Sequence, residues 1–270
     1  MTAVRDALDS ALVALTAAGV ENPRLDAELL LADALGVDRT RLYLDRDLEV
    51  RGPSVRRFQE LVRRRAVQRE PVAYLLGSKG FRRLDLAVDG RVLIPRPETE
   101  LLVELTVAAL PTGGRVVDVG TGSGAIALAL ADERPDLSVT GSDVSADALA
   151  VASANGARLG DAVAWVLADG LPLGRWDGVV ANLPYVQAGT TLAPEISRHE
   201  PALAVFSGAD GLDVIRRVIG QAAAARVPWV AFEHGSEQGD AVRLLLRMAG
   251  WTDVRTERDL AGLERVTVGC

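Results

Sequence analysis

The sequence predicts an α/β protein with a largely parallel sheet, preceded by a small helical bundle domain and a β-hairpin linker. From about residue 115 onward, short apolar runs alternate with amphipathic stretches, which is typical of a Rossmann-like sheet with helices on both faces. Before residue 75 the pattern is helical, with no convincing strand. At 270 residues the chain is long enough for one large and one small domain.

Composition excludes several classes of function. A net charge of −7 argues against avid, sequence-independent binding to nucleic acid, which requires a basic surface. Cys270 is the only cysteine and His199 and His234 are the only histidines, so we expect no disulfide framework and no metal site. No apolar run reaches membrane-spanning length, which predicts a cytoplasmic protein, and nothing requires more than a monomer.

The first domain is expected to span residues 1–76. Its apolar spacing predicts a helix ending at Gly19 and further helices over 24–35, 38–44 and 53–70. Six arginines lie between residues 56 and 69. They indicate either a solvated helix face or a local contact for an acidic partner or RNA.

A hairpin is expected to link the domains over residues 77–94. Apolar residues alternate before Asp89-Gly90 and resume at 91–94, and Asp-Gly between apolar runs is typical of a hairpin turn. The second domain would then cover 95–270. Within it, Pro95 and Pro97 hold Arg96 in a stiff loop before a helix over 101–110, which leaves a role for this loop in the site open.

The second domain reads as alternating strands and helices. We expect strands over 115–119, 137–142, 163–167, a run ending at Ala181, and 227–233. The helices between them are predicted over 124–133, 146–159, 210–225 and 236–249. Residues 252–257 and 265–268 would close the sheet as two antiparallel strands.

A glycine-rich turn follows the first of these strands and predicts a nucleoside cofactor site. Its residues are Gly120, Thr121, Gly122, Ser123 and Gly124. The three glycines carry no side chain, which lets a ligand approach the backbone there. The pattern also fits a nicotinamide dinucleotide loop, so the motif alone leaves the cofactor open.

Two further strand ends carry carboxylates. Asp143 ends the second strand, where it can accept hydrogen bonds from both ribose hydroxyls; it is alternatively a helix cap, a role that Ser145 can also fill. Asp169 and Gly170 follow the third strand and are placed to meet an adenine, although Asp169 reads equally well as a hydrated loop residue.

The tetrad Asn182, Leu183, Pro184 and Tyr185 favours methyl transfer over hydride transfer. A planar NH2 group is a weak nucleophile, and two acceptors that take its two hydrogens would orient its lone pair toward a methylsulfonium carbon. The Asn182 side-chain oxygen and the Leu183 carbonyl are the expected acceptors. Pro184 would stiffen the loop and Tyr185 would stack on the planar group.

Segments over nearly the whole chain match one known family. They are Arg69–Gly77, Val92–Glu104, Asp118–Ala127, Asn182–Tyr185, Glu200-Pro201, Gly211–Asp213 and Arg258–Val266. The chain resembles the peptide chain release factor glutamine N5-methyltransferases, the PrmC/HemK type of class I S-adenosylmethionine enzymes. The stretches Ile94–Glu100 and Arg258–Gly262 are the more specific ones, since many methyltransferases share the glycine loop.

The resemblance implies a seven-stranded catalytic domain, S-adenosylmethionine as cofactor and a release-factor-binding helical domain. Its implied substrate is the glutamine in the Gly-Gly-Gln loop of bacterial release factors, with no stable nucleic acid partner. The glycine loop, Asp143 and Asn182 match the family's cofactor-contacting positions, and Gly170 stands where some relatives carry an aromatic residue.

Leu183 departs from the family, which usually has a first proline in this tetrad. Leucine keeps the backbone carbonyl and loses only rigidity. Because Asn-Leu-Pro-Tyr is also similar to the tetrad of ribosomal RNA adenine dimethyltransferases, an adenine-N6 methyltransferase acting on RNA or DNA remains an alternative. Two further alternatives are an enzyme that methylates a glutamine of a ribosomal protein and a non-catalytic module that binds the cofactor or a release factor.

Overall fold

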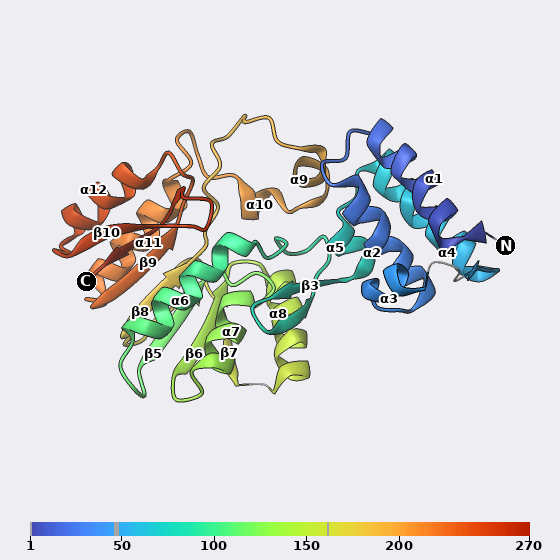
Figure 1. The fold of residues 1–270 in the computed structure, drawn as a ribbon. Helices are drawn as coiled ribbons and strands as arrows, with labels where there is room; N and C mark the ends of the chain where they lie inside the picture. Colours follow the sequence, from blue (N-terminus) through green and yellow to red (C-terminus); the bar gives the residue numbers. More distant parts are fainter. Residues whose placement is uncertain (1, 46–48, 161) are drawn as a thin grey trace. The chain divides into compact units, whose positions relative to one another are not determined.

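The computed structural model describes residues 2–45, 49–160 and 162–270, and the chain divides into two compact units (Figure 1). The first comprises Met1–Gly77 together with Leu192–His199, and the second comprises Ser78–Thr191 and Glu200–Cys270. The sequence pattern does not predict this short return of the chain to the first unit at 192–199.

The first unit is a bundle of helices. They are α1 (Val4–Ala17), α2 (Pro23–Leu35), α3 (Arg39–Leu44), α4 (Pro53–Arg63), a π-helical turn (Arg64–Gln68), α5 (Val72–Leu76) and α9 (Pro194–His199). The observed ranges confirm the expected helices. Their apolar faces pack into one core that contains Leu15, Leu30, Leu31 and Phe58. The expectation of no strand is wrong in one detail: β1 (Thr2–Ala3) pairs with β2 (Glu49–Val50).

The arginine-rich stretch is largely neutralised inside this unit. Arg65 is buried, with Nε 2.7 Å from Asp26 Oδ2 and Nη1 2.6 Å from Glu195 Oε1. Arg69 donates to the same Glu195 oxygen and to the carbonyl of Ala18. Arg57, Arg63 and Arg64 pair with Asp33, Glu60 and Glu70. Arg56, Arg57 and Arg63 are exposed, so part of the stretch is a solvated face, and a contact with an acidic partner or RNA stays a prediction.

We expect Arg65→Ala to destabilise the first unit by about 3 kcal/mol, because it leaves the Asp26 and Glu195 carboxylates without their buried partner. Arg63→Ala is the matched control, since that arginine is half exposed and pairs at the surface, and should cost less than about 0.5 kcal/mol. Hydrogen exchange of the α2 amides under increasing urea measures both changes. Equal losses of stability in the two variants would contradict a stabilising role for the buried Arg65.

The hairpin forms, but its expected turn is wrong. β3 (Ser78–Phe81) pairs with β4 (Leu84–Ala87), so the turn lies at Arg82-Arg83 rather than at Asp89-Gly90. The Arg82 side chain forms ion pairs with the carboxylates of Glu100, Glu104 and Glu133, and its backbone in the turn has a φ of 52°. Asp89 instead accepts from the Arg91 backbone N–H in a local turn. Tertiary ion pairs thus outweigh the local Asp-Gly preference.

The second unit contains a seven-stranded sheet in the order β10-β11-β9-β8-β5-β6-β7. The strands are β5 (Arg115–Val119), β6 (Ser138–Asp143), β7 (Val163–Leu167), β8 (Gly178–Ala181), β9 (Trp229–Glu233), β10 (Val254–Arg258) and β11 (Glu264–Gly269). Pairings among β5 to β9 are parallel, and β11 pairs antiparallel with both β9 and β10. The predicted mixed sheet is confirmed.

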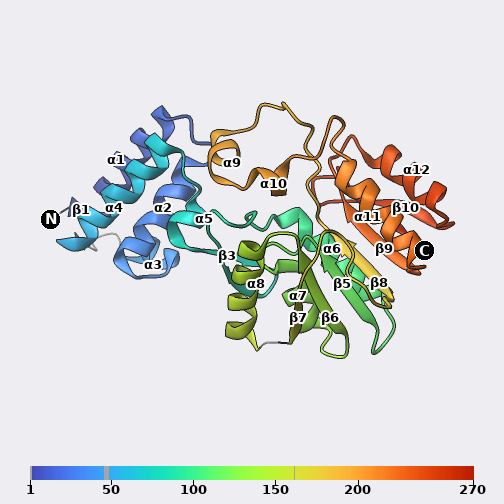
Figure 2. The ribbon, with the colours of Figure 1, turned by 180° about the vertical axis from the view of Figure 1, so that it is seen from behind.

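Helices cover both faces of this sheet (Figure 1 and Figure 2). They are α6 (Glu100–Ala109), α7 (Ala125–Glu133), α8 (Ala146–Leu159), α11 (Asp213–Ala224) and α12 (Gly239–Ala249). The short α10 (Ala202–Val205) lies in the connection between β8 and α11. Val116 packs with residues of α6 and α7, whereas the next residue, Val117, packs with residues of α11 and α12. This alternation makes two apolar layers and leaves the strand ends as the polar edge of the sheet. Within the described residues, the longest helices fall short of what a bilayer crossing requires.

Candidate active site

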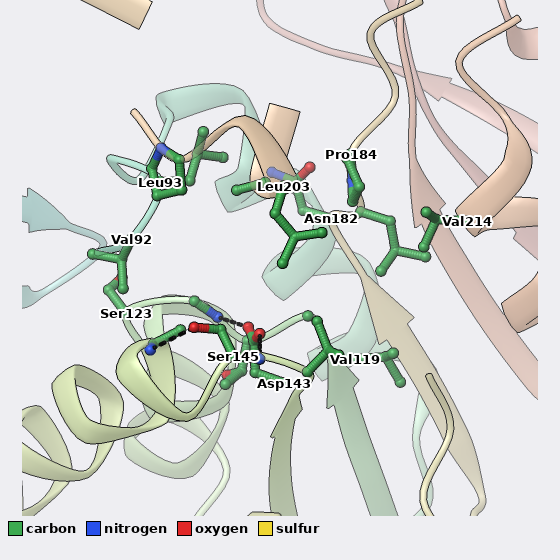
Figure 3. Close-up of a pocket in the computed structure, with 18 of the residues that line it drawn as sticks. Val92, Leu93, Val119, Ser123, Asp143, Ser145, Asn182, Pro184, Leu203 and Val214 are labelled. Atoms are coloured by element: carbon green, nitrogen blue, oxygen red, sulfur yellow. Dashed lines mark hydrogen bonds between the residues drawn. The ribbon is translucent and has the colours of Figure 1, made fainter. Parts of the chain in front are cut away.

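The carboxyl ends of β5, β6 and β8 border one cavity of about 480 Å³ in the second unit. It is lined by most of the predicted site residues: Gly120, Thr121, Gly122, Ser123, Asp143, Asp169, Gly170, Asn182, Leu183 and Pro184. Gly124 and Tyr185 do not line it. Figure 3 shows Asn182 and Leu203 on one side of the cavity, with Asp143 and Ser145 across from them. Parallel strands explain the convergence, because their carboxyl ends meet at one edge.

The glycine loop requires glycine for two separate reasons. Gly120 has a φ of 75°, and a Cβ there would lie 3.0 Å from Leu183 Cδ2. Gly124 has a φ of 84°, and its Cβ would lie 2.9 Å from the Trp165 ring. The first glycine therefore lets the loop approach the tetrad, whereas the second lets the start of α7 pack on the core.

A buried carboxylate supports this loop from below. Asp118 Oδ2 accepts from Thr121 Oγ1 at 2.6 Å and from the Ala127 N–H at 3.3 Å. Its Oδ1 is buried without a hydrogen bond from the part of the chain that the structure describes. Burial raises the pKa of Asp118 to about 7, against the hydrogen bonds from Thr121 and Ala127 that lower it.

The raised pKa of Asp118 gives a stability prediction with a definite sign. Between about pH 4 and 7 the folded protein holds a proton that the unfolded chain releases, so the free energy of unfolding falls as pH rises. Asp118→Asn cannot ionise, so its stability relative to wild type should improve by roughly 2–3 kcal/mol from pH 5 to pH 7. Urea unfolding of both proteins at the two pH values measures this difference; an unchanged difference would contradict it.

Asp143 holds the loop to the second strand. Its Oδ2 accepts from the Gly122 N–H at 3.0 Å and its Oδ1 from the Ser145 N–H at 2.9 Å. The cap of α8 is Ser145, whose Oγ accepts from the Ala148 N–H. The alternative role of Asp143 as helix cap is therefore wrong. Each carboxylate oxygen retains capacity for a further hydrogen bond toward the cavity.

The Asp169 carboxylate is exposed but forms an ion pair. Its carboxylate lies 2.8 Å from Arg217 Nη1, and Arg217 also lines the cavity. The neighbouring Gly170 has a φ of 90°, and a Cβ there would lie 2.2 Å from Gln221 Oε1. Gln221 donates to the Asp169 carbonyl and accepts from the Leu171 N–H. The glutamine thus occupies the space beside residue 170, so a larger residue there would have to displace it and adopt a positive φ.

The tetrad presents two acceptor atoms. Asn182 Nδ2 donates to Thr99 Oγ1 at 3.0 Å, which leaves Oδ1 as the other end of the amide. Neither Asn182 Oδ1 nor the Leu183 carbonyl oxygen accepts a hydrogen bond from any residue that the structure describes. The Tyr185 hydroxyl points to Glu233 Oε1 at 3.4 Å, and burial raises the pKa of Tyr185. Its stacking role stays a prediction.

Sequence reasoning left a role for the Arg96 loop open and assigned none to Thr99, Glu200 or Glu233, which also lie around the site. Thr99 and Arg96 line the cavity, and Arg96 forms an ion pair with the buried Glu200. Glu233 is fully buried at the carboxyl end of β9. The rule that located Asp143 and Asn182, a polar residue at a strand end, would also have selected Glu233. Among the described residues, no cluster of His, Cys, Asp and Glu is placed to hold a metal ion.

Known proteins similar to this chain share its full length. A release factor glutamine methyltransferase of Xylella fastidiosa is 42% identical, covering 97% of this chain and 98% of that protein. One from Mycolicibacterium smegmatis is also 42% identical, covering 98% of this chain and 96% of that protein. The chain belongs to the release factor glutamine methyltransferase family, of the PrmC/HemK type.

Family models divide this release factor glutamine methyltransferase chain in two. The PrmC N-terminal domain matches residues 6–77, and the methyltransferase small domain matches residues 97–199. Among solved structures, the hMettl16 catalytic domain in complex with the MAT2A 3′UTR hairpin 6 has a TM-score of 0.55 at 14% identity. The match covers 82% of this chain and 83% of that chain. At this identity it shows a likeness in fold alone.

Proposed function

We propose that this protein transfers a methyl group from S-adenosylmethionine to the side-chain amide nitrogen of the glutamine in the Gly-Gly-Gln motif of a bacterial release factor. Family membership over the full length supports the reaction class. The single observation that carries the chemistry is the pair of oxygens, Asn182 Oδ1 and the Leu183 carbonyl, which accept no hydrogen bond from the described part of the chain. They lie in a loop that lines the same cavity as Asp143. The resemblance supplies the identity of the substrate.

The cavity fits the cofactor. Its volume of about 480 Å³ suits a nucleoside-sized ligand. Gly120 and Gly122 expose backbone without a Cβ, and Asp143 retains acceptor capacity for the two ribose hydroxyls. Asp169 and Gly170 are the proposed neighbours of the adenine. When bound, S-adenosylmethionine supplies an electrophilic methyl carbon attached to a positively charged sulfur.

The tetrad makes the amide nitrogen a usable nucleophile. Its lone pair is delocalised into the carbonyl, so the nitrogen must be oriented before it can attack. Asn182 Oδ1 and the Leu183 carbonyl would each accept one amide N–H, which fixes the plane of the NH2 group and turns its lone pair toward the cofactor side of the cavity. Pro184 stiffens the loop and Tyr185 would pack on the amide.

No strong base is required in this scheme. As the new N–C bond forms, the bond between the methyl carbon and the cofactor sulfur would break with its electron pair left on sulfur, so that S-adenosylhomocysteine is the leaving group. The positive charge passes to the nitrogen, which therefore becomes acidic. It then loses one proton late, to water or to an adjacent acceptor, and the neutral methylated amide leaves. The two oxygens of the tetrad stabilise the positive charge that develops on the N–H groups.

The proposed partner is the release factor, and the helical unit is its proposed binding domain. A release factor substrate would place the reaction in the cytoplasm. We further propose that one chain suffices, since every residue that lines the cavity comes from the second unit of the same chain.

We expect Asp143→Asn to weaken cofactor binding by roughly 10- to 100-fold, because it removes a charged acceptor for the ribose hydroxyls. Asp147→Asn is the control: this exposed carboxylate on the first turn of α8 lies outside the cavity lining, so its affinity should stay within about twofold of wild type. Titration calorimetry with S-adenosylhomocysteine measures both. Wild-type affinity in Asp143→Asn would remove this residue from the cofactor site.

Mass spectrometry of a purified release factor, incubated with this protein and S-adenosylmethionine, tests the function. We expect a gain of one methyl group on the Gly-Gly-Gln glutamine. Asn182→Ala should lower the rate by about 100-fold or more while retaining most cofactor affinity, because it removes an acceptor that orients the amide. Wild-type turnover in that variant would refute the assignment.

The same assay separates the alternatives. Labelled methyl appearing on adenine in RNA or DNA would indicate the nucleic-acid enzyme, and methyl on a ribosomal protein would indicate a different protein substrate. Cofactor uptake without transfer to any of these would indicate a binding module.

A further inference from the structure

Leu203 is an exposed apolar residue in the lining of the cavity. Its side chain borders the same cavity as Asn182 and Asp143, yet the residue is 62% exposed. Figure 3 shows Leu203 and Asn182 on one side of the cavity, across from Asp143. The side of Asn182 is the side on which the tetrad would hold the acceptor amide, whereas Asp143 marks the side of the cofactor ribose. Leu203 is therefore placed to contact the substrate rather than the cofactor.

The end of α10, the short helix that carries Leu203, is fixed to the segment that follows the tetrad. The Val186 N–H donates to the Val205 carbonyl at 3.0 Å, and the Ser207 N–H donates to the Val186 carbonyl at 2.9 Å. The first residue after the tetrad is thus hydrogen-bonded twice to the chain that leaves α10. These two hydrogen bonds tie the position of Leu203 to that of the tetrad.

The start of α10 is fixed to another segment of the cavity lining. Glu200 precedes this helix, and its side chain is 1% exposed. Its Oε1 lies 2.5 Å from Arg96 Nη2, and Arg96 lines the cavity from the loop that Pro95 and Pro97 stiffen. Because a buried carboxylate is stable only when it is paired, this ion pair holds the two segments together.

A helix held at both ends presents a preorganised side chain. Leu203 can therefore contact a ligand without the entropic cost of ordering its segment. An acceptor glutamine whose amide lies at Asn182 would carry its two CH2 groups and its backbone out of the cavity on the side of Leu203. In the proposed substrate the residue before this glutamine is glycine, which has no side chain to compete with the leucine for space. The apolar wall thus fits the chemistry of the acceptor segment.

We propose that Leu203 determines substrate specificity: the CH2 groups of the acceptor glutamine and the glycine before it pack on this side chain, whose place is set by the Arg96–Glu200 ion pair. Leu203 thus selects a glutamine that follows glycine, and Glu200 is a positioning residue. The inference rests on the proposed function for the identity of the acceptor.

Two release factors test this selection, one with the natural Gly-Gly-Gln sequence and one with Gly-Ala-Gln. In Leu203→Ala we expect the KM for the natural release factor to rise about 5- to 10-fold with kcat within about twofold, because a contact made equally before and during the reaction is lost. The kcat/KM for Gly-Ala-Gln relative to Gly-Gly-Gln should rise by about fivefold or more, since the added methyl group then has room. Affinity for S-adenosylhomocysteine should stay within about twofold of wild type.

Leu173→Ala is the matched control. Leu173 is a fully exposed leucine as well, but it lies outside the cavity lining. Its replacement should leave KM, kcat and the discrimination between the two release factors within about twofold of wild type. Both leucines are exposed, so we expect both variants to fold.

Glu200→Gln tests the positioning role. This change keeps an acceptor for Arg96 but removes the charge, which weakens the hold on α10. We expect it to relax the discrimination between the two release factors in the same direction as Leu203→Ala. The double variant should relax it no further than Leu203→Ala alone, because both changes act through one side chain. Unchanged discrimination in a folded Glu200→Gln protein would contradict the positioning role; if this variant does not fold, Leu203→Ala still decides the inference.

Binding separates this inference from the proposed function. Wild-type KM and discrimination in Leu203→Ala, or a loss of cofactor affinity in their place, would overturn the inference, while methylation of the natural release factor would still support the function. If the release factor binds the protein with S-adenosylhomocysteine, and Leu203→Ala weakens that binding about fivefold or more, but no methyl group is ever transferred, the inference is supported and the proposed function is refuted.

Discussion

The site depends on the close approach of two loops from neighbouring strands. Leu183 is buried against the turn after β5, where a Cβ on Gly120 would lie 3.0 Å from its Cδ2. This contact holds the glycine loop and the tetrad side by side in the lining of one cavity. It also explains how leucine can stand where relatives usually have proline: its side chain fills the space over Gly120, so packing supplies part of the rigidity that a proline ring would give.

Burial of carboxylates is the second constraint on this unit. Asp118 lies beneath the glycine loop and Glu233 lies behind the tetrad, each with one oxygen lacking a full hydrogen bond from the described residues. Burial raises the pKa of both groups to about 7. Such groups lower the free energy of unfolding at neutral pH. Because both lie next to the two site loops, we infer that they are retained for the arrangement of the site rather than for stability.

Much of this architecture is predictable from the sequence, for identifiable reasons. The strands and helices after residue 115 follow from apolar periodicity, and Gly120, Asp143 and Asn182 follow from the rule that ligands bind at strand ends. The hairpin turn is not predictable in this way, because ion pairs of Arg82 with Glu104 and Glu133 outweigh the local Asp-Gly preference. The pairing of Thr99 with Asn182 is equally hidden, since it joins segments far apart in the chain. The contact of Gln221 with Gly170 is hidden for the same reason, since these residues are also far apart in the chain.

The return of the chain to the first unit at 192–199 limits how this protein can be taken apart or recombined. A fragment ending near residue 77 would retain Arg65 and Arg69 but lose Glu195, the carboxylate that both arginines share. A chimaera that exchanges only the amino-terminal segment with that of a relative would likewise combine arginines and α9 of different origin. Exchange of the helical unit between members of the family therefore requires two coordinated crossovers, and substitutions in the two segments are expected to be inherited together.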